Sequence, residues 1–181
     1  MAQAAGAWTL ADLDRLPDDG NRYELIAGEL FVTPAPSPAH EVLATVLKEL
    51  LDPYVRQERL GRAFLGKSVI QTEGSQVEPD LMVRQTPKIL PEKWPEMPLP
   101  ILVVEVLSAI TRRRDHVEKR AFYLRNGVAE YWIVNRWDRT VDVVTPNADD
   151  VVVDTQLTWH PNGASSALDI DVAEYFRSVL G

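Results

Sequence analysis

The sequence predicts a mixed α/β fold, a central β-sheet with helices on both of its faces. Two apolar runs, residues 77–83 and 101–107, have the Val, Ile and Leu content of strands that are covered on both faces. A long segment that begins at Ser37 repeats apolar residues at helical spacing, and residues 111–126 form a second helical segment that ends at Gly127. Strands and helices that are mixed in this way are typical of one α/β domain.

Turn, cap and proline signals predict the remaining elements. Thr9 or Asp12 caps a short first helix, and Gly28 marks the turn of a first hairpin. Pro38 takes the first position of the long helix, where a proline is tolerated. The predicted helices are 9–15, a long one from 37, 111–126 and 172–179. The predicted strands are 23–26, 29–32, 63–65, 68–71, the strand that contains Asp80, the strand that contains Glu105, 129–134, 140–144 and 151–157.

The length of 181 residues suits one domain with a substantial core, so we expect residues 1–181 to form a single domain. Residues 1–20 are an N-terminal extension of it. Residues 86–100 hold five prolines and are expected to form a surface loop. No run approaches the roughly 18 apolar residues that span a bilayer, and the N-terminus lacks a signal-peptide pattern. We therefore expect a cytoplasmic location and no membrane contact.

The composition restricts the kinds of site that the chain can form. Cysteine is absent, which excludes disulfides and thiolate metal sites, so any metal needs oxygen or histidine ligands. The net charge of -8 argues against strong nucleic-acid binding by the whole surface. A local basic groove is compatible with this charge, because arginine and lysine are concentrated in residues 112–125.

One carboxylate stands in the middle of an apolar strand. Glu105 lies within the run 101–107, and an ionised carboxylate is rarely buried unless it is paired or binds a metal. Asp80 lies in the preceding apolar run. Two acids on neighbouring strands predict a half-open site for a divalent cation such as Mg²⁺, which keeps several waters and supports phosphodiester hydrolysis. Lys119, on the following helix, is the predicted amine that orients the water or stabilises developing negative charge.

These residues carry a resemblance to a known family. Over residues 20–178 the sequence resembles the Uma-type bacterial family of restriction-endonuclease-like proteins, within the PD-(D/E)XK nuclease superfamily. The matching parts are 22–30, 36–40, 77–81, 103–108, Thr111, Arg112, Asp115, Lys119, Arg120, Tyr123 and 127–134. Each part alone is a weak signal, but the order and spacing of the whole series make the resemblance specific.

The resemblance implies a restriction-endonuclease-like fold, in which a mixed central sheet is flanked by helices and extended by N-terminal and C-terminal hairpins. It implies an endonuclease that hydrolyses DNA phosphodiester bonds. Mg²⁺, or Mn²⁺ in its place, would be held by Asp80, Glu105 and the backbone carbonyl of Val106. Because superfamily nucleases that cut both strands tend to be dimers, the resemblance also implies a homodimer, for which the late hairpin is a candidate interface.

One position departs from the superfamily pattern. The superfamily lysine stands two residues after the glutamate, where this chain has Leu107, and Lys119 is expected to supply the amine instead. Helical geometry leaves two arrangements open. If the aromatic side with Tyr123 faces the sheet, Lys119 reaches the site; if the aliphatic stripe with Val117 faces the sheet, Lys119 does not.

Several supporting residues have both a functional and a structural interpretation. Glu24 is either a third acid of the site or a member of a structural ion pair. His40 either contacts the substrate or a metal ligand, or only begins the long helix. Tyr123 is either a supporting residue of the site or a packing aromatic. The candidate DNA contacts, which otherwise form a solvated helical turn, are Arg112, Arg113 and Arg114.

Two other classes of function stay open beside the nuclease. A nuclease fold with weak or no catalysis would serve as a binding module, which the acidic charge and Leu107 favour. A metal-dependent hydrolase of small phosphorylated or nucleotide substrates would suit the acidic surface. The structural alternatives for the main site are Asp80 as a turn cap, Glu105 paired with an arginine and Lys119 in solvent.

Overall fold

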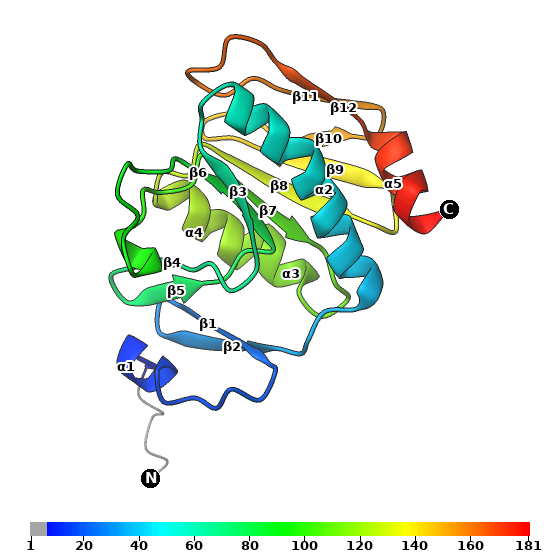
Figure 1. Ribbon diagram of the computed structural model, residues 1–181. Helices are drawn as coiled ribbons and strands as arrows, with labels where there is room; N and C mark the ends of the chain where they lie inside the picture. Colours follow the sequence, from blue (N-terminus) through cyan, green and yellow to red (C-terminus); the bar gives the residue numbers. More distant parts are fainter. Residues whose placement is uncertain (1–6) are drawn as a thin grey trace.

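A mixed six-stranded sheet forms the centre of the molecule (Figure 1). The computed structural model describes residues 7–181. Neighbouring strands follow the order β10 (Val151–Val153), β9 (Thr140–Val144), β8 (Glu130–Asn135), β7 (Leu102–Val106), β6 (Leu81–Arg84) and β3 (Arg62–Leu65). β7 and β8 run parallel, and the other neighbouring pairs are antiparallel. The predicted α/β class with a mixed central sheet is therefore confirmed.

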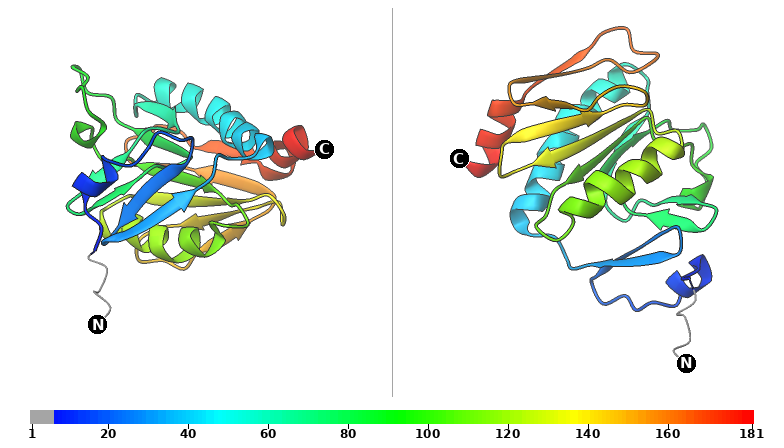
Figure 2. Two further views of the ribbon diagram at one scale, coloured as in Figure 1. Left: turned by 90° about the horizontal axis from the view of Figure 1, so that it is seen from below. Right: turned by 180° about the vertical axis from the view of Figure 1, so that it is seen from behind.

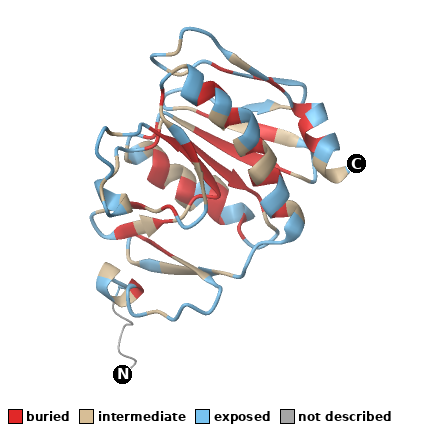
Figure 3. Cartoon of the chain, viewed as in Figure 1, coloured by how far each residue is buried: buried red, intermediate tan, exposed pale blue. Residues whose placement is uncertain are grey.

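Helices cover both faces of this sheet (Figure 2). One face packs against α2 (Pro38–Gln57), α5 (Val172–Leu180) and the two-stranded sheet of β11 (Gln156–Trp159) and β12 (Leu168–Asp171). The other face is covered by α3 (Arg112–Arg114), the π-helical turn η2 (Asp115–Lys119) and α4 (Arg120–Arg125). The central strands are buried along most of their length, as their continuous apolar sequences predict (Figure 3).

Strand β7 distributes its side chains between the two faces. Val104 and Val106 pack into the apolar cluster beneath α2 and α5, whereas Val103 and Leu107 pack into the cluster beneath α4. Each such side chain contributes roughly 1.5–3 kcal/mol when it is fully buried. Because side chains alternate along a strand, Glu105 points to the same side as Val103 and Leu107. Packing on both sides of β7 thus fixes the direction of this carboxylate.

A second sheet carries the N-terminal hairpin (Figure 1). Its strands follow the order β2 (Glu29–Thr33), β1 (Arg22–Ile26), β5 (Ser75–Val77) and β4 (Ile70–Thr72). The predicted turn at Gly28 is present, and its φ of 83° lies in the region that favours glycine. The sequence does not predict β5, because its three residues are mostly polar and give no alternating pattern.

Four other details differ from the sequence-based expectations. Residues 151–157 do not form one strand, because a bend separates β10 from β11. The short strand β12 has no clear apolar signal and is not predicted. The helix expected over residues 111–126 is interrupted by η2. Asp80 lies in a bend directly before β6, where it is free of the strand's ladder of hydrogen bonds.

Two peripheral segments complete the fold. α1 (Leu10–Leu13) lies in the N-terminal extension. The Thr9 side chain caps it by accepting a hydrogen bond from the Asp12 amide, and the Asp12 carboxylate accepts one from the Thr9 amide. A short 3-10 helix, η1 (Trp94–Glu96), interrupts the proline-rich loop, in which Ile89 is 87% exposed. Within residues 7–181, no helix is long and apolar enough to cross a membrane.

Candidate active site

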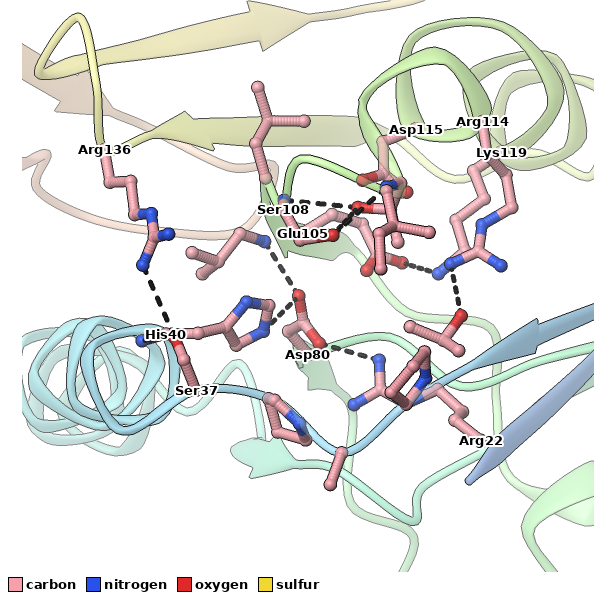
Figure 4. A pocket seen from close by; sticks show the side chains of 18 residues that line it. Arg22, Ser37, His40, Asp80, Glu105, Ser108, Arg114, Asp115, Lys119 and Arg136 are labelled. Atoms are coloured by element: carbon pink, nitrogen blue, oxygen red, sulfur yellow. Dashed lines mark hydrogen bonds and ion pairs between the residues drawn. The ribbon is translucent and has the colours of Figure 1, made fainter. Parts of the chain in front are cut away.

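A cavity of about 160 Å³ lies beside the carboxyl end of β7. Its walls come from the loop after β7, the bend before β6, the connection from β2 to α2, and the helical segment α3–η2. Figure 4 shows the side chains that line it. Among them are the three predicted catalytic residues, Asp80, Glu105 and Lys119. The fold therefore brings these residues to one place from three separate elements.

Asp80 is buried, and polar groups from three elements surround its carboxylate. Its Oδ1 accepts a hydrogen bond from Arg22 Nη1 at 2.7 Å, and its Oδ2 accepts one from the Val106 amide at 2.8 Å. His40 Nε2 lies 3.0 Å from Oδ2, an ion-pair distance without hydrogen-bond alignment. Burial opposes ionisation, but His40 and Arg22 hold the pKa of Asp80 well below its usual range. Asp80 is therefore an ionised carboxylate that lines the cavity, and it is not simply the cap of a turn.

Glu105 is buried next to a lysine and a tyrosine. Its Oε1 accepts hydrogen bonds from Lys119 Nζ at 2.7 Å and from Tyr123 Oη at 2.6 Å. Burial raises the pKa of Glu105 to about 8 against the attraction of Lys119, and the carboxylates of Asp80 and Asp115 act in the same direction as burial. Glu105 is paired with a lysine and not with an arginine, which settles one of the structural alternatives.

Lys119 is buried in the site and is not a solvated helix residue. Its Nζ lies 2.7 Å from Glu105 Oε1 and 2.8 Å from Glu24 Oε1. Burial disfavours the charged amine, but these two carboxylates raise the pKa of Lys119 above its ordinary value. The ammonium is therefore charged, and it faces the cavity as well as both acids.

Lys119 lies at the end of the π-helical turn η2. A π turn holds more residues than an α turn, and such turns are frequent at functional sites. Asp115, Lys119 and Tyr123 follow one another at intervals of four residues and are all buried, whereas Val117 is 52% exposed. The aromatic side of the helix thus faces the sheet, which decides between the two arrangements that the sequence leaves open. Leu107 packs in the apolar cluster beside Tyr123.

Glu24 adds a third acid and takes part in an ion-pair network. In addition to Lys119, it contacts Arg114 Nη2 at 3.5 Å through Oε2 and accepts a hydrogen bond from the Glu78 amide at 2.9 Å. Burial opposes ionisation, but Lys119 and Arg114 lower the pKa of Glu24 below its usual value. Glu24 is thus a buried, ion-paired acid behind Lys119, and it is not among the residues that line the cavity.

The three candidate DNA-contacting arginines do not form one surface. Arg114 is buried, and its Nη2 donates to Thr33 Oγ1 at 2.8 Å, so it points into the protein. Arg113 is exposed and pairs with Glu118. Arg112 is also exposed, with its guanidinium carbon 5.4 Å from the centre of the Trp137 ring.

Comparison with known proteins places this chain in a family. Residues 10–173 match the Uma2 family, which is described as "Putative restriction endonuclease". The chain belongs to the Uma2 family. A similar solved structure is the crystal structure of a putative nuclease belonging to DUF820 from Anabaena variabilis ATCC 29413. Its sequence is 23% identical to this chain, and the match covers 96% of this chain and 99% of the solved chain. The TM-score of 0.80 shows a shared fold. No curated protein matches the chain.

The predicted resemblance is confirmed by this membership, and the Uma2 fold reveals site residues that sequence reasoning did not select. Arg22 begins β1 and binds Asp80, and its spacing of two from Glu24 is the signal that both point to one face. Arg136 lines the cavity from the turn after β8. A surface turn gives no sequence signal for such a role. Asp115 lines the cavity too, and burial raises its pKa.

The residues present fit a divalent cation that keeps most of its waters. Among the residues that the structure describes, no group of three or more His, Asp and Glu side chains forms a ready metal site. Mg²⁺ needs only one or two carboxylates besides water. Four buried carboxylates cluster here, and Glu24 Oε2 and Asp115 Oδ1 find no hydrogen-bond partner within residues 7–181. The buried acids in the cluster are Glu24, Asp80, Glu105 and Asp115.

Proposed function

We propose that this Uma2 protein is a metal-dependent nuclease that hydrolyses phosphodiester bonds of DNA, with Mg²⁺ as its cofactor and Mn²⁺ as a substitute. The observation that carries the proposal is the buried lysine beside the buried acids. Lys119 Nζ lies 2.7 Å from Glu105 Oε1, at a cavity that Asp80 also lines. The family description supports the same class of activity.

Asp80, Glu105 and the backbone carbonyl of Val106 would hold the metal. Val106 lines the cavity, and its amide already fixes Asp80. The bound cation would polarise a phosphate oxygen and lower the pKa of a water molecule. A second positive charge next to Glu105 also favours the ionised carboxylate, against the burial that raises its pKa.

The remaining groups orient these ligands and stabilise charge. Lys119 presents a permanent ammonium to the cavity, where it would stabilise the negative charge that develops on the phosphate. Tyr123 fixes the rotamer of Glu105 through its 2.6 Å hydrogen bond. Arg22 holds Asp80 from β1, and His40 does so from the first turn of α2.

Cleavage of plasmid DNA tests this proposal. The wild-type protein is expected to cut in Mg²⁺ or Mn²⁺ and to stop in EDTA, and Asp80→Asn and Glu105→Gln are expected to abolish cutting. Glu73→Gln is the matched control, because Glu73 is exposed in the turn between β4 and β5. Cutting that survives both site substitutions would contradict the assignment.

A catalytically inactive binding module is the alternative that one observation favours. The charges of Asp80, Glu105 and Glu24 are already compensated by Arg22, Lys119 and other cations of the chain. A module of this kind would bind DNA without cutting it in any metal. Hydrolysis of nucleotides without DNA cleavage would favour the third class, a small-substrate hydrolase.

We also propose that the protein is a homodimer. The edge strand β10 exposes Val151 and Val152, which are 57% and 64% accessible, next to the late hairpin of β8 and β9. Light scattering measures the mass in solution, and a monomeric mass at working concentrations would contradict the dimer.

A further inference from the structure

An exposed tryptophan lies beside two arginines at the turn that joins β8 to β9. Trp137 is 45% exposed. The guanidinium carbon of Arg136 lies 4.7 Å from the centre of its ring, and that of Arg112 lies 5.4 Å away. The three side chains, which we call the Trp137 platform, combine an aromatic ring with two positive charges. Proteins bind nucleic-acid strands with this combination, because bases stack on the ring and cations contact phosphates.

The turn is held in a fixed conformation by a buried side chain. Asn135 Oδ1 accepts hydrogen bonds from the amides of Trp137 at 3.1 Å and Asp138 at 3.3 Å. Asn135 Nδ2 donates to Asp138 Oδ2 at 2.7 Å. Side-chain bonds of this kind fix a turn against its alternatives. The indole is therefore presented to solvent from a fixed backbone, although burying it would have been more favourable for folding.

The platform lies next to the cavity of the candidate active site. Arg136 lines that cavity and donates to Ser37 Oγ at 3.4 Å, as Figure 4 shows. Thr111, which immediately precedes Arg112, lines the same cavity. A nucleotide chain with one phosphate in the cavity would thus place a neighbouring nucleotide within reach of Trp137.

We propose that the Trp137 platform binds an unstacked base beside the scissile phosphate, so that the substrate is single-stranded or locally unpaired DNA. This inference rests on the proposed nuclease function. A paired base inside a duplex has both of its faces covered by its neighbours, so an indole can stack only on a base that has left the duplex. The net charge of -8 agrees with a short contact, because strong binding of a long duplex needs many clustered cations.

Binding without metal tests the platform separately from catalysis. The probes are a fluorescein-labelled oligothymidylate of about 12 nucleotides and its duplex with oligoadenylate, both titrated in EDTA. Trp137→Ala is expected to weaken binding of the single strand roughly 10- to 100-fold, the value of one base stacked on an aromatic ring. Binding of the duplex is expected to change by less than about 2-fold, since its bases cannot reach the ring.

Two control variants separate stacking from general charge and from folding. Arg125→Ala removes an exposed arginine from the last turn of α4, and it is expected to bind as the wild type does. Oligothymidylate is expected to quench tryptophan fluorescence in the wild type and in Trp8→Phe, whose indole is 41% exposed, but not in Trp137→Phe. Equal melting temperatures of all variants show that they fold alike.

The outcomes distinguish this inference from the proposed nuclease function. Wild-type cutting of plasmid DNA, together with Trp137→Ala binding that matches the wild type, would overturn the platform and leave the nuclease standing. Weakened single-strand binding without any metal-dependent cutting would support the platform and reject the nuclease. An equal loss of affinity for single strand and duplex would overturn the preference for unpaired DNA.

Discussion

The two faces of strand β7 contact very different surroundings. On the side of α2 and α5, Val104 and Val106 join a large cluster of hydrophobic residues. On the side of α4, Glu105 stands between Val103 and Leu107 and contacts the charged amine of Lys119. One strand therefore combines a face that stabilises the fold with a face that concentrates buried charge, and stability and chemistry can be changed separately.

The charged face is stable only while its charges remain paired. Desolvation of a buried ion pair can cancel the attraction between its members, but loss of one member leaves the other unpaired. Removing a charge from this face is therefore expected to harm both stability and activity. Removing an aliphatic group from the opposite face is expected to harm stability alone.

The largest effect is expected from Lys119→Met. This change leaves Glu105 and Glu24 without their shared cation, so the free energy of unfolding should fall by about 3–5 kcal/mol. DNA cleavage should fall roughly 100- to 1000-fold with the loss of the ammonium. Urea denaturation and the cleavage rate measure the two effects, and Lys88→Met, in the exposed proline-rich loop, is the control.

A double variant sharpens this prediction. Glu105→Met combined with Lys119→Met removes both charges of the pair but leaves Glu24 with Arg114 alone, so the protein should regain part of the lost stability and remain inactive. Stability losses that simply add in the double variant would show that the two side chains do not interact.

Leu47→Ala is the matched change on the apolar face. Leu47 is 1% exposed on α2, and truncating a leucine in such a site costs about 2–5 kcal/mol of unfolding free energy. The cleavage rate per folded molecule should stay at the wild-type value. A specific loss of activity at full folding would break the proposed separation of the two faces.

Tyr123→Phe should have a smaller effect. The change removes the 2.6 Å hydrogen bond to Glu105 Oε1 and keeps the aromatic packing. Unfolding free energy should fall by about 0.5–1.5 kcal/mol, the net value of a typical hydrogen bond. Cleavage should fall about 10-fold with the looser carboxylate. An unchanged pH profile and rate would mean that the hydroxyl does not position Glu105.

The smallest effect is expected far from the site, at Glu58. Its carboxylate accepts hydrogen bonds from Ser165 and Ser166, which lower its pKa from 4.5 to about 2. The ionised form is thus favoured by folding, so its contribution is present above about pH 4.5 and is lost as the pH falls through about 2. Denaturation of Glu58→Gln and wild type should differ at neutral pH and converge in acid. A difference that persists in acid would contradict this assignment.

Sequence patterns predicted the acidic part of the site better than its cationic part. Asp80 and Glu105 were identifiable because an acid within an apolar run breaks the pattern of its surroundings. The direction of Lys119 was not, because either the aromatic or the aliphatic side of its helix could have faced the sheet. Arg136 and Trp137 depend on a turn that a buried asparagine shapes, so only the folded chain shows their position.

The elements of the fold, too, were predictable only where the sequence carries a strong apolar period. The central strands and the long helix were predicted because burial on two faces, or on one helical stripe, leaves a strong apolar period. β5 and β12 were missed because short strands with polar residues carry no such period. Residues 151–157 were predicted as one strand, but a bend at Asp154 and Thr155 separates β10 from β11.

Calorimetric titration of Mn²⁺ tests most directly whether the charged face of β7 is a metal centre. Wild-type protein is expected to bind the ion at one site, and Asp80→Asn and Glu105→Gln are expected to lose that binding while they remain folded. Glu73→Gln should bind as the wild type does. Binding that is unchanged in both site variants, or absent from the wild type, would contradict the account.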